Sequence, residues 1–227
     1  MSHQHILRVT GKGQLNLVPD QVRLSLEIEG TCPEYLDAVE TASKKTKQLQ
    51  EILKKLGFSK TDLKTTAFNV SPDYERYEVW DDERAEKKWE SRLEGYEYRQ
   101  TMKLEFDRDN ERMGKILYAL AHSSAHPEIR ISYTIKDQEA AKNNLLAKAV
   151  VDAKSKAVIL AKAANVELLG IQSMDYSWGK MEFEVTPYDG AAMMAPPMAA
   201  PSESFDYDIE PDDIHVEDTV TVIWEIS

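Results

Sequence analysis

Strict alternation of apolar and polar side chains runs through residues 22–28, which read Val-Arg-Leu-Ser-Leu-Glu-Ile. Because successive strand residues point to opposite faces, the four apolar side chains are predicted to bury one face and leave the other in water. Similar one-sided alternation recurs at residues 129–135 and 216–226. The pattern predicts an α+β fold, in which mainly antiparallel sheet carries helices on one face.

Three segments of helical periodicity, at about residues 34–56, 109–121 and 137–164, predict three helices for that face. The third helix has an inward stripe of mostly small residues, which lets a helix lie close to a sheet. The predicted stripe consists of Ala141, Leu145, Ala149, Ala153, Ala157, Leu160 and Ala164.

Local signals predict where these helices begin and end. Thr31 and Glu34 have the spacing of a capping box before the first helix, and Gly57 is a stop signal after it. Asp109 and Asp137 are predicted to cap the N-termini of the second and third helices.

The strands and loops between the helices follow from turn signals and composition. Residues 63–107 predict one long hairpin with a charged and aromatic tip, and Gly11 to Gly13 predict a tight turn between two short strands. Residues 187–204, rich in Ala, Met and Pro, predict a flexible loop. A helix, a glycine and a strand follow one another at 38–70 and again at 147–178. This weak internal repeat is compatible with a single domain over residues 1–227 and also with two related lobes.

The overall charge limits the classes of partner. The chain of 227 residues has a formal net charge of -12 and no cluster of Lys and Arg, which argues against nucleic acid. It contains no run of 18 apolar residues, so no transmembrane segment is expected. The first residues lack the apolar core of a secretory signal, which predicts a cytoplasmic protein. If the N-terminus has been trimmed, the periplasm or cell envelope is the alternative.

Candidate chemistry is sparse. Cys32, the single cysteine, precedes the first predicted helix, where the helix dipole favours a thiolate, but no basic partner or second cysteine lies nearby. The acidic residues of 206–217 imitate the spacing of a calcium loop, yet Pro211 stands where the sharp turn needs glycine. No catalytic, cofactor-binding or metal-binding residue is therefore predicted, and the chain is expected not to be an enzyme.

Several short motifs resemble the SIMPL-domain family in their order and spacing, from about residue 6 to residue 226. They comprise Val9-Thr10-Gly11-Lys12-Gly13 with Val18-Pro19-Asp20, Leu56-Gly57-Phe58 with Asp62-Leu63-Lys64-Thr65, Leu93-Glu94-Gly95-Tyr96, the helix 147–164, Leu168-Leu169-Gly170-Ile171, and Ile209-Glu210-Pro211 with the strand 216–226. The resemblance implies an α+β fold without an established enzymatic activity. Bacterial relatives are typically exported, include immunogenic proteins and can form ring-like oligomers, and a mammalian relative is a kinase-associated adaptor.

Three functional hypotheses remain. The first is a non-enzymatic protein that forms homo-oligomers, with an envelope or stress-related role implied by the resemblance. Because aromatic side chains are enriched at interfaces, its candidate interface lies in the hairpin and comprises Tyr74, Tyr77, Trp80, Trp89 and Tyr96. The bland alternative is that these rings pack on their own sheet. The second hypothesis is a small-ligand or metal-binding protein that uses the polar sheet face or the acidic loop 206–217. The third is an enzyme that acts through Cys32.

Overall fold

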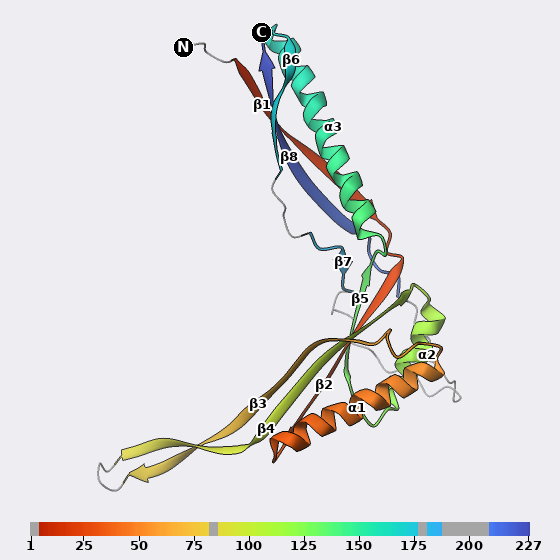
Figure 1. The fold of residues 1–227 in the computed structure, drawn as a ribbon, viewed down its shortest axis with the longest axis vertical. Helices are drawn as coiled ribbons and strands as arrows, with labels where there is room; N and C mark the ends of the chain where they lie inside the picture. Colours follow the sequence, from red (N-terminus) through yellow and green to blue (C-terminus); the bar gives the residue numbers. More distant parts are fainter. Residues whose placement is uncertain (1–4, 82–85, 177–180, 188–208) are drawn as a thin grey trace. The chain divides into compact units, whose positions relative to one another are not determined.

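The computed structural model describes residues 5–81, 86–176, 181–187 and 209–227, which form two antiparallel sheets and three helices (Figure 1). The predicted α+β class is confirmed. The chain divides into two compact units, each of which is described by itself below. Unit 1 consists of Met1–Gln21, Tyr133–Thr186 and Pro211–Ser227, and unit 2 consists of Val22–Ser132 and Pro187–Glu210.

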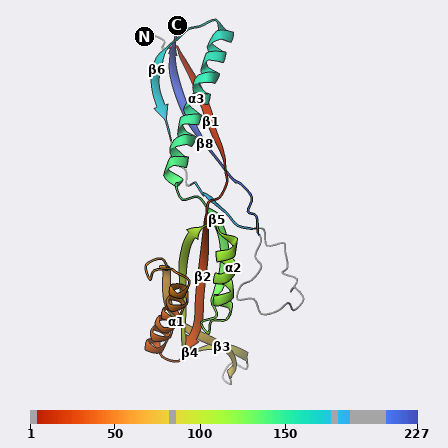
Figure 2. The same ribbon diagram turned by 90° about the vertical axis from the view of Figure 1, so that its right-hand side faces the viewer.

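Unit 1 contains a three-stranded sheet in the order β1-β8-β6, with the long helix α3 along one face (Figure 2). These elements span Ile6–Leu17 (β1), Ile214–Ile226 (β8), Leu168–Asp175 (β6) and Gln138–Ala164 (α3). A short strand β7, Glu184–Val185, pairs with Tyr133 and Thr134 at the end of strand β5, Glu128–Thr134.

Strand β1 runs without interruption through the two glycines that were predicted to form a turn, so that prediction is wrong. Gly11 pairs with Val220 and Gly13 with Asp218 in a regular ladder. A Cβ atom on Gly11 would lie 2.0 Å from the carbonyl oxygen of Ala149, and one on Gly13 would lie 2.1 Å from that of Leu145. The glycines are required because the backbone of α3 lies directly against the strand.

The side of α3 that meets the sheet follows every fourth residue. Its buried residues are Ala141, Leu145, Ala149, Ala153, Ala157 and Ala161. The first five were predicted, but Leu160 is 47% exposed and Ala164 is also exposed, so the predicted last turn is wrong. A row of residues spaced by four is inclined by about 26° to the helix axis. The side of α3 that packs on the twisted sheet therefore shifts gradually around the helix from its first turn to its last.

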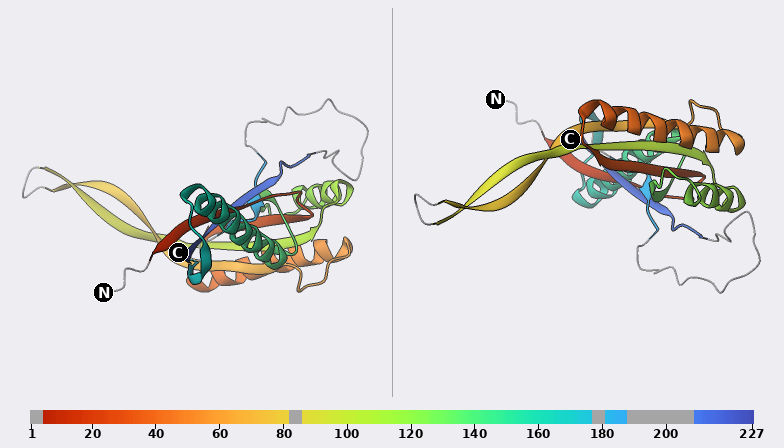
Figure 3. Two further views of the ribbon diagram at one scale, coloured as in Figure 1. Left: turned by 90° about the horizontal axis from the view of Figure 1, so that it is seen from above. Right: turned by 90° about the horizontal axis from the view of Figure 1, so that it is seen from below.

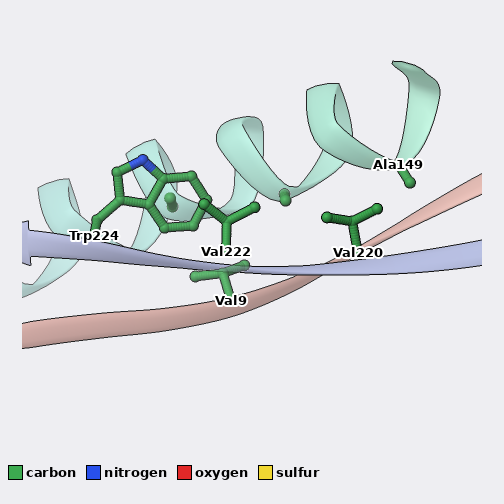
Figure 4. Close-up of a cluster of buried hydrophobic side chains, with 7 residues drawn as sticks. Val9, Ala149, Val220, Val222 and Trp224 are labelled. Carbon is green, nitrogen blue, oxygen red and sulfur yellow. The ribbon is translucent and has the colours of Figure 1, made fainter. Parts of the chain in front are cut away.

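The core of unit 1 forms where larger side chains of the strands fill the space left by those alanines (Figure 4). Val220, Val222 and Trp224 of β8 and Val9 of β1 are all buried there against Ala149 and its neighbours on the stripe. Small residues on the helix therefore face large residues on β8, and glycines face the helix on β1.

Unit 2 contains the strands β3, β4, β2 and β5, in that order across the sheet, and the helices α1 and α2. The elements span Gln21–Cys32 (β2), Tyr35–Lys55 (α1), Lys64–Asp81 (β3), Glu86–Asp107 (β4), Asn110–Ala121 (α2) and Glu128–Thr134 (β5). The four alternating apolar residues of β2 are all buried, as predicted. The opposite face carries ion pairs such as Arg23–Glu105, at 2.7 Å, and Arg99–Glu27, at 3.4 Å.

Most predicted helix ends are confirmed. The carboxylate of Asp109 accepts a hydrogen bond from the Arg112 amide (3.0 Å), and Asp137 likewise caps α3. Gly57 has a φ of 86° and ends α1 in a Schellman motif, in which the Phe58 amide donates to the Leu53 carbonyl (3.1 Å).

The predicted capping box at the start of α1 is wrong. Thr31 and Cys32 still belong to β2, and Glu34 occupies the N-cap position without a side-chain cap. Of the predicted flexible loop 187–204, residues 188–204 lie outside the described residues. The prediction that 1–227 is one SIMPL-like domain stays a prediction.

Replacing Gly11 with Ala is expected to destabilise unit 1 by about 3 kcal/mol, because the new methyl group meets helix backbone that has no room to move. Gly170→Ala is the matched control, since a Cβ there meets nothing within 4 Å. Urea unfolding followed by circular dichroism measures the difference. Equal unfolding midpoints for Gly11→Ala and the wild type would contradict the close contact between β1 and α3.

The stability of unit 2 is expected to depend on the charge of Glu105. Burial alone raises the pKa of this carboxyl, but hydrogen bonds from Arg23 (2.8 Å) and Lys103 (3.2 Å) outweigh burial and hold the pKa below its ordinary value of 4.5. A depressed carboxyl pKa stabilises the fold above pH 4.5, and this contribution is lost as the pH falls through the folded-state pKa. Glu105→Gln should therefore lower the melting temperature at pH 7 and make little difference near pH 3, whereas Glu51→Gln, at an exposed position, should change neither.

Candidate functional site

The β3–β4 hairpin is longer than the helix that covers it. Strand β3 has 18 residues and extends about 60 Å, whereas the 21 residues of α1 extend only about 32 Å. The ribbon therefore continues beyond the first turn of α1 as two strands alone (Figures 1 and 3). We call this continuation, Tyr74–Trp80 with Lys87–Leu93, the arm.

One face of the arm gathers large apolar side chains. In the ladder, Tyr74 pairs with Leu93, Glu78 with Trp89, and Trp80 with Lys87, so these residues share a face. Trp80 is 58% exposed and Trp89 is 63% exposed, and Tyr74 and Leu93 are exposed as well. We call Tyr74, Trp80, Trp89 and Leu93 the apolar arm face.

The opposite face of the arm is occupied by interactions within the arm. Glu75 and Arg92 form an ion pair at 2.9 Å, and the guanidinium carbon of Arg92 lies 6.0 Å from the centre of the Tyr77 ring. The Tyr77 hydroxyl donates to Glu90 at 3.5 Å, and Lys88 reaches Glu90 at 3.1 Å. Tyr77, predicted as an interface residue, therefore lies apart from the two tryptophans.

A bulge produces this division. The pairing shifts between Asp73, which faces Gly95, and Tyr74, which faces Leu93, so Glu94 is passed over. An extra residue reverses the alternation of everything beyond it. Without the bulge, Leu93 and Trp89 would lie on the Tyr77 face. Sequence reasoning missed Leu93 because its face depends on this pairing.

Tyr96, the fifth predicted interface residue, belongs to the base of the hairpin. Its ring meets Tyr35 edge to face, with ring centres 5.6 Å apart, and packs beside Ala38, Ala42 and Tyr98. For this residue, packing within unit 2 accounts for the side chain. The structure thus brings Tyr74, Trp80 and Trp89 together and separates Tyr77 and Tyr96 from them.

A second apolar surface lies in unit 1, between α3 and the edge strand β6. The groove has a volume of about 280 Å³, and its apolar walls include Val150 and Val158 of α3 and Ile171 and Met174 of β6. Val222 and Trp224 of β8 also line it. Sequence reasoning did not find this groove, because β6 has no regular alternation and contains two register shifts.

The polar sheet face of unit 1, proposed for ligands, is paired within itself. Its residues form a hollow of about 590 Å³ that includes Gln14, Asn16, His215 and Glu217. His215 lies 2.7 Å from the side chain of Asn16, and Glu217 lies 2.6 Å from Lys12. Hydrogen bonds from Lys12 and Gln14 lower the pKa of the Glu217 carboxyl. These partners join β1 to β8, so the polar groups are already engaged.

The acidic loop 206–217 is only partly described, because residues 206–208 lie outside the described residues. Glu210 pairs with Arg108, and Glu217 belongs to β8. Within the described ranges, no three His, Cys, Asp or Glu side chains are grouped to hold a metal ion.

Cys32 lies at the end of β2 and not in the first turn of α1. Its sulfur is 3.8 Å from the hydroxyl of Thr41, and the side chain borders the cluster of Ala38, Ala42 and Tyr98. The helix-dipole argument for a thiolate therefore loses its structural basis, because α1 begins three residues later at Tyr35.

Comparison with protein-family models matches residues 7–224 to SIMPL, described as a protein of unknown function (DUF541). The chain belongs to the SIMPL family. This confirms the resemblance seen in the sequence, and the SIMPL match includes residues of both units and the arm. A search of curated proteins finds no match. In the described part of this SIMPL protein, no helix has the length and hydropathy needed to cross a membrane.

The division of the aromatic residues predicts different effects on stability. Tyr96→Ala should destabilise unit 2 by about 2–3 kcal/mol, because it removes a ring packed against Tyr35 and the α1 cluster. Trp80→Ala should change the stability of the monomer by less than about 0.5 kcal/mol, because its ring is mostly exposed. Urea unfolding at low protein concentration measures both, and similar losses for the two variants would refute the assignment.

Proposed function

We propose that this SIMPL-family protein is a non-enzymatic scaffold that associates with further copies of itself through the apolar arm face. The observation that carries the proposal is the asymmetry of the arm. One face is occupied by ion pairs such as Glu75–Arg92. The other also carries the Glu78–Lys87 ion pair, at 2.6 Å, but presents Trp80 and Trp89 without cover from the described residues of unit 2. A partner is the simplest physical reason for such a face.

Energetics support this reading. An isolated two-stranded hairpin is only marginally stable in water. Among the described residues of unit 2, no third strand or helix lies beside the arm. Four half-exposed large side chains offer on the order of 300–400 Å² of apolar surface, the size of patch that marks interaction sites on soluble proteins. Burial of the arm in an assembly would stabilise it.

The described carboxylates with shifted pKa support a structural role over acid–base catalysis. The Lys156 side chain and the Lys12 amide donate hydrogen bonds that lower the pKa of Asp152, which joins α3 to β1. The Ser59 hydroxyl and amide lower the pKa of Asp62 within one turn. Each of these groups holds the fold together.

Truncating both tryptophans of the arm should weaken self-association. Each buried interfacial tryptophan contributes about 2 kcal/mol or more, so Trp80→Ala with Trp89→Ala should raise the dissociation constant at least about 100-fold. Sedimentation velocity over a range of protein concentrations measures this. Replacing residues 76–92 with a short turn should abolish association.

Tyr77→Ala is the matched control, because it removes an aromatic ring from the opposite face of the same ribbon. It should leave the dissociation constant within about threefold of wild type. If the wild type is monomeric at all concentrations, or if the shortened chain sediments in the same oligomeric state as wild type, the proposed function is wrong.

A further inference from the structure

Helix α3 contacts the two edge strands of the unit 1 sheet, β1 and β6, in different ways. Along β1, the Lys12 amide donates to the Asp152 carboxylate at 2.7 Å. The ammonium group of Lys148 donates to the Gln14 carbonyl, and that of Lys156 donates to the Thr10 carbonyl, both at 3.4 Å. Helix side chains thus bond the outer backbone edge of β1, which protects it from pairing with another chain.

At the other edge, the face of β6 that looks toward α3 is left uncovered. Ile171 pairs with Trp224 and Met174 with Val222, so both lie on the same side of the sheet as the buried core. Trp224 and Val222 are buried, whereas Ile171 is 53% exposed and Met174 is similarly exposed. The groove of about 280 Å³ between α3 and β6 is therefore a continuation of the core that none of the described residues of unit 1 fills.

The groove has a basic rim in an acidic protein. Helix α3 contains five lysines and two acidic residues in a chain with a net charge of -12. Of these lysines, Lys148 and Lys156 lie against β1 and not at the groove. Lys154 lines the groove, and Lys162 lies two turns farther along the same side of the helix. Neither lysine forms an ion pair with any residue that the structure describes.

The arm has the complementary chemistry. Trp80 and Trp89 supply flat apolar side chains. The sequence around the hairpin tip, residues 78–88, contains five acidic residues, one arginine and two lysines, a formal net charge of -2. An acidic, aromatic tip matches an apolar groove with a lysine rim, since opposite charges steer the partners together while the rings fill the groove.

We propose that the arm of one copy inserts Trp80 and Trp89 into the α3–β6 groove of a neighbouring copy. This rests on the proposed function and names the receptor for the arm. Because the two surfaces differ and every copy has both, the contact is heterologous and repeats from copy to copy. Such contacts generate a closed ring if the rotation between neighbours closes, and an open filament otherwise.

Complementation between two variants tests the proposal. The arm variant combines Trp80→Ala with Trp89→Ala, and the groove variant combines Val158→Glu with Ile171→Glu, both at exposed positions. Each variant alone should be monomeric at concentrations where the wild type assembles. A mixture should form a 1:1 dimer that grows no further, because one intact arm meets one intact groove. Circular dichroism and melting temperature verify that each variant is folded.

Two matched controls isolate the groove and its charge. Val151→Glu places the same charge on α3 outside the groove, at a residue 64% exposed, and should assemble like wild type. Lys154→Glu should weaken assembly at least about tenfold, whereas Lys44→Glu, an equal change of net charge on α1, should not. Raising the salt concentration should also weaken wild-type assembly, because the charges lie at a solvated rim.

The outcomes separate this inference from the proposed function. If the arm variant is monomeric but the groove variant assembles normally, the groove is not the receptor and the proposed function survives. If both variants are monomeric and their mixture stays monomeric, the pairing of arm with groove is wrong. If the arm variant assembles like the wild type, the proposed function itself is wrong.

Discussion

Each sheet buries its apolar face under helices, and the area that these helices cover determines where this protein exposes apolar surface. A residue adds about 1.5 Å to a helix and about 3.3 Å to a strand, so a strand of similar residue number extends twice as far as the helix above it. In unit 2, β3 and β4 pass beyond α1, and the arm begins there. In unit 1, one helix lies over three strands and covers only two of them fully. Both apolar surfaces that we propose to join copies of the chain lie where a helix stops covering its sheet.

The position of α3 on its sheet depends on small residues from both partners. Gly11 and Gly13 let the helix backbone touch β1, and the alanines at every fourth position let β8 fill the remaining space with Val222 and Trp224. This contact draws α3 toward β1, where its polar side chains bond the strand edge. The same displacement leaves Ile171 and Met174 of β6 half exposed, so the packing that stabilises one edge opens the groove at the other.

Most patterns that depend on near neighbours were read correctly from the sequence. The alternation of residues 22–28, the caps Asp109 and Asp137, and the first five residues of the α3 stripe are set by geometry within one element. One local prediction, the capping box of Thr31 and Glu34, was wrong because β2 continues through Cys32. Other errors involve distant partners. Gly11 and Gly13 suggested a turn because their real neighbour, α3, lies more than 130 residues later in the chain. The predicted interface contained both tryptophans of the arm, but sequence could not assign their face without the bulge at Glu94.

By itself, the sequence determined the fold class, the SIMPL family and the set of aromatic side chains in the hairpin, because periodicity, motif order and composition are local properties. Only the tertiary structure decided that Tyr96 packs on Tyr35, that Tyr77 lies opposite the tryptophans, and that an apolar groove opens beside β6. The reason is that the face of a strand residue depends on the register with its neighbour, and the cover over a strand depends on where a distant helix comes to rest.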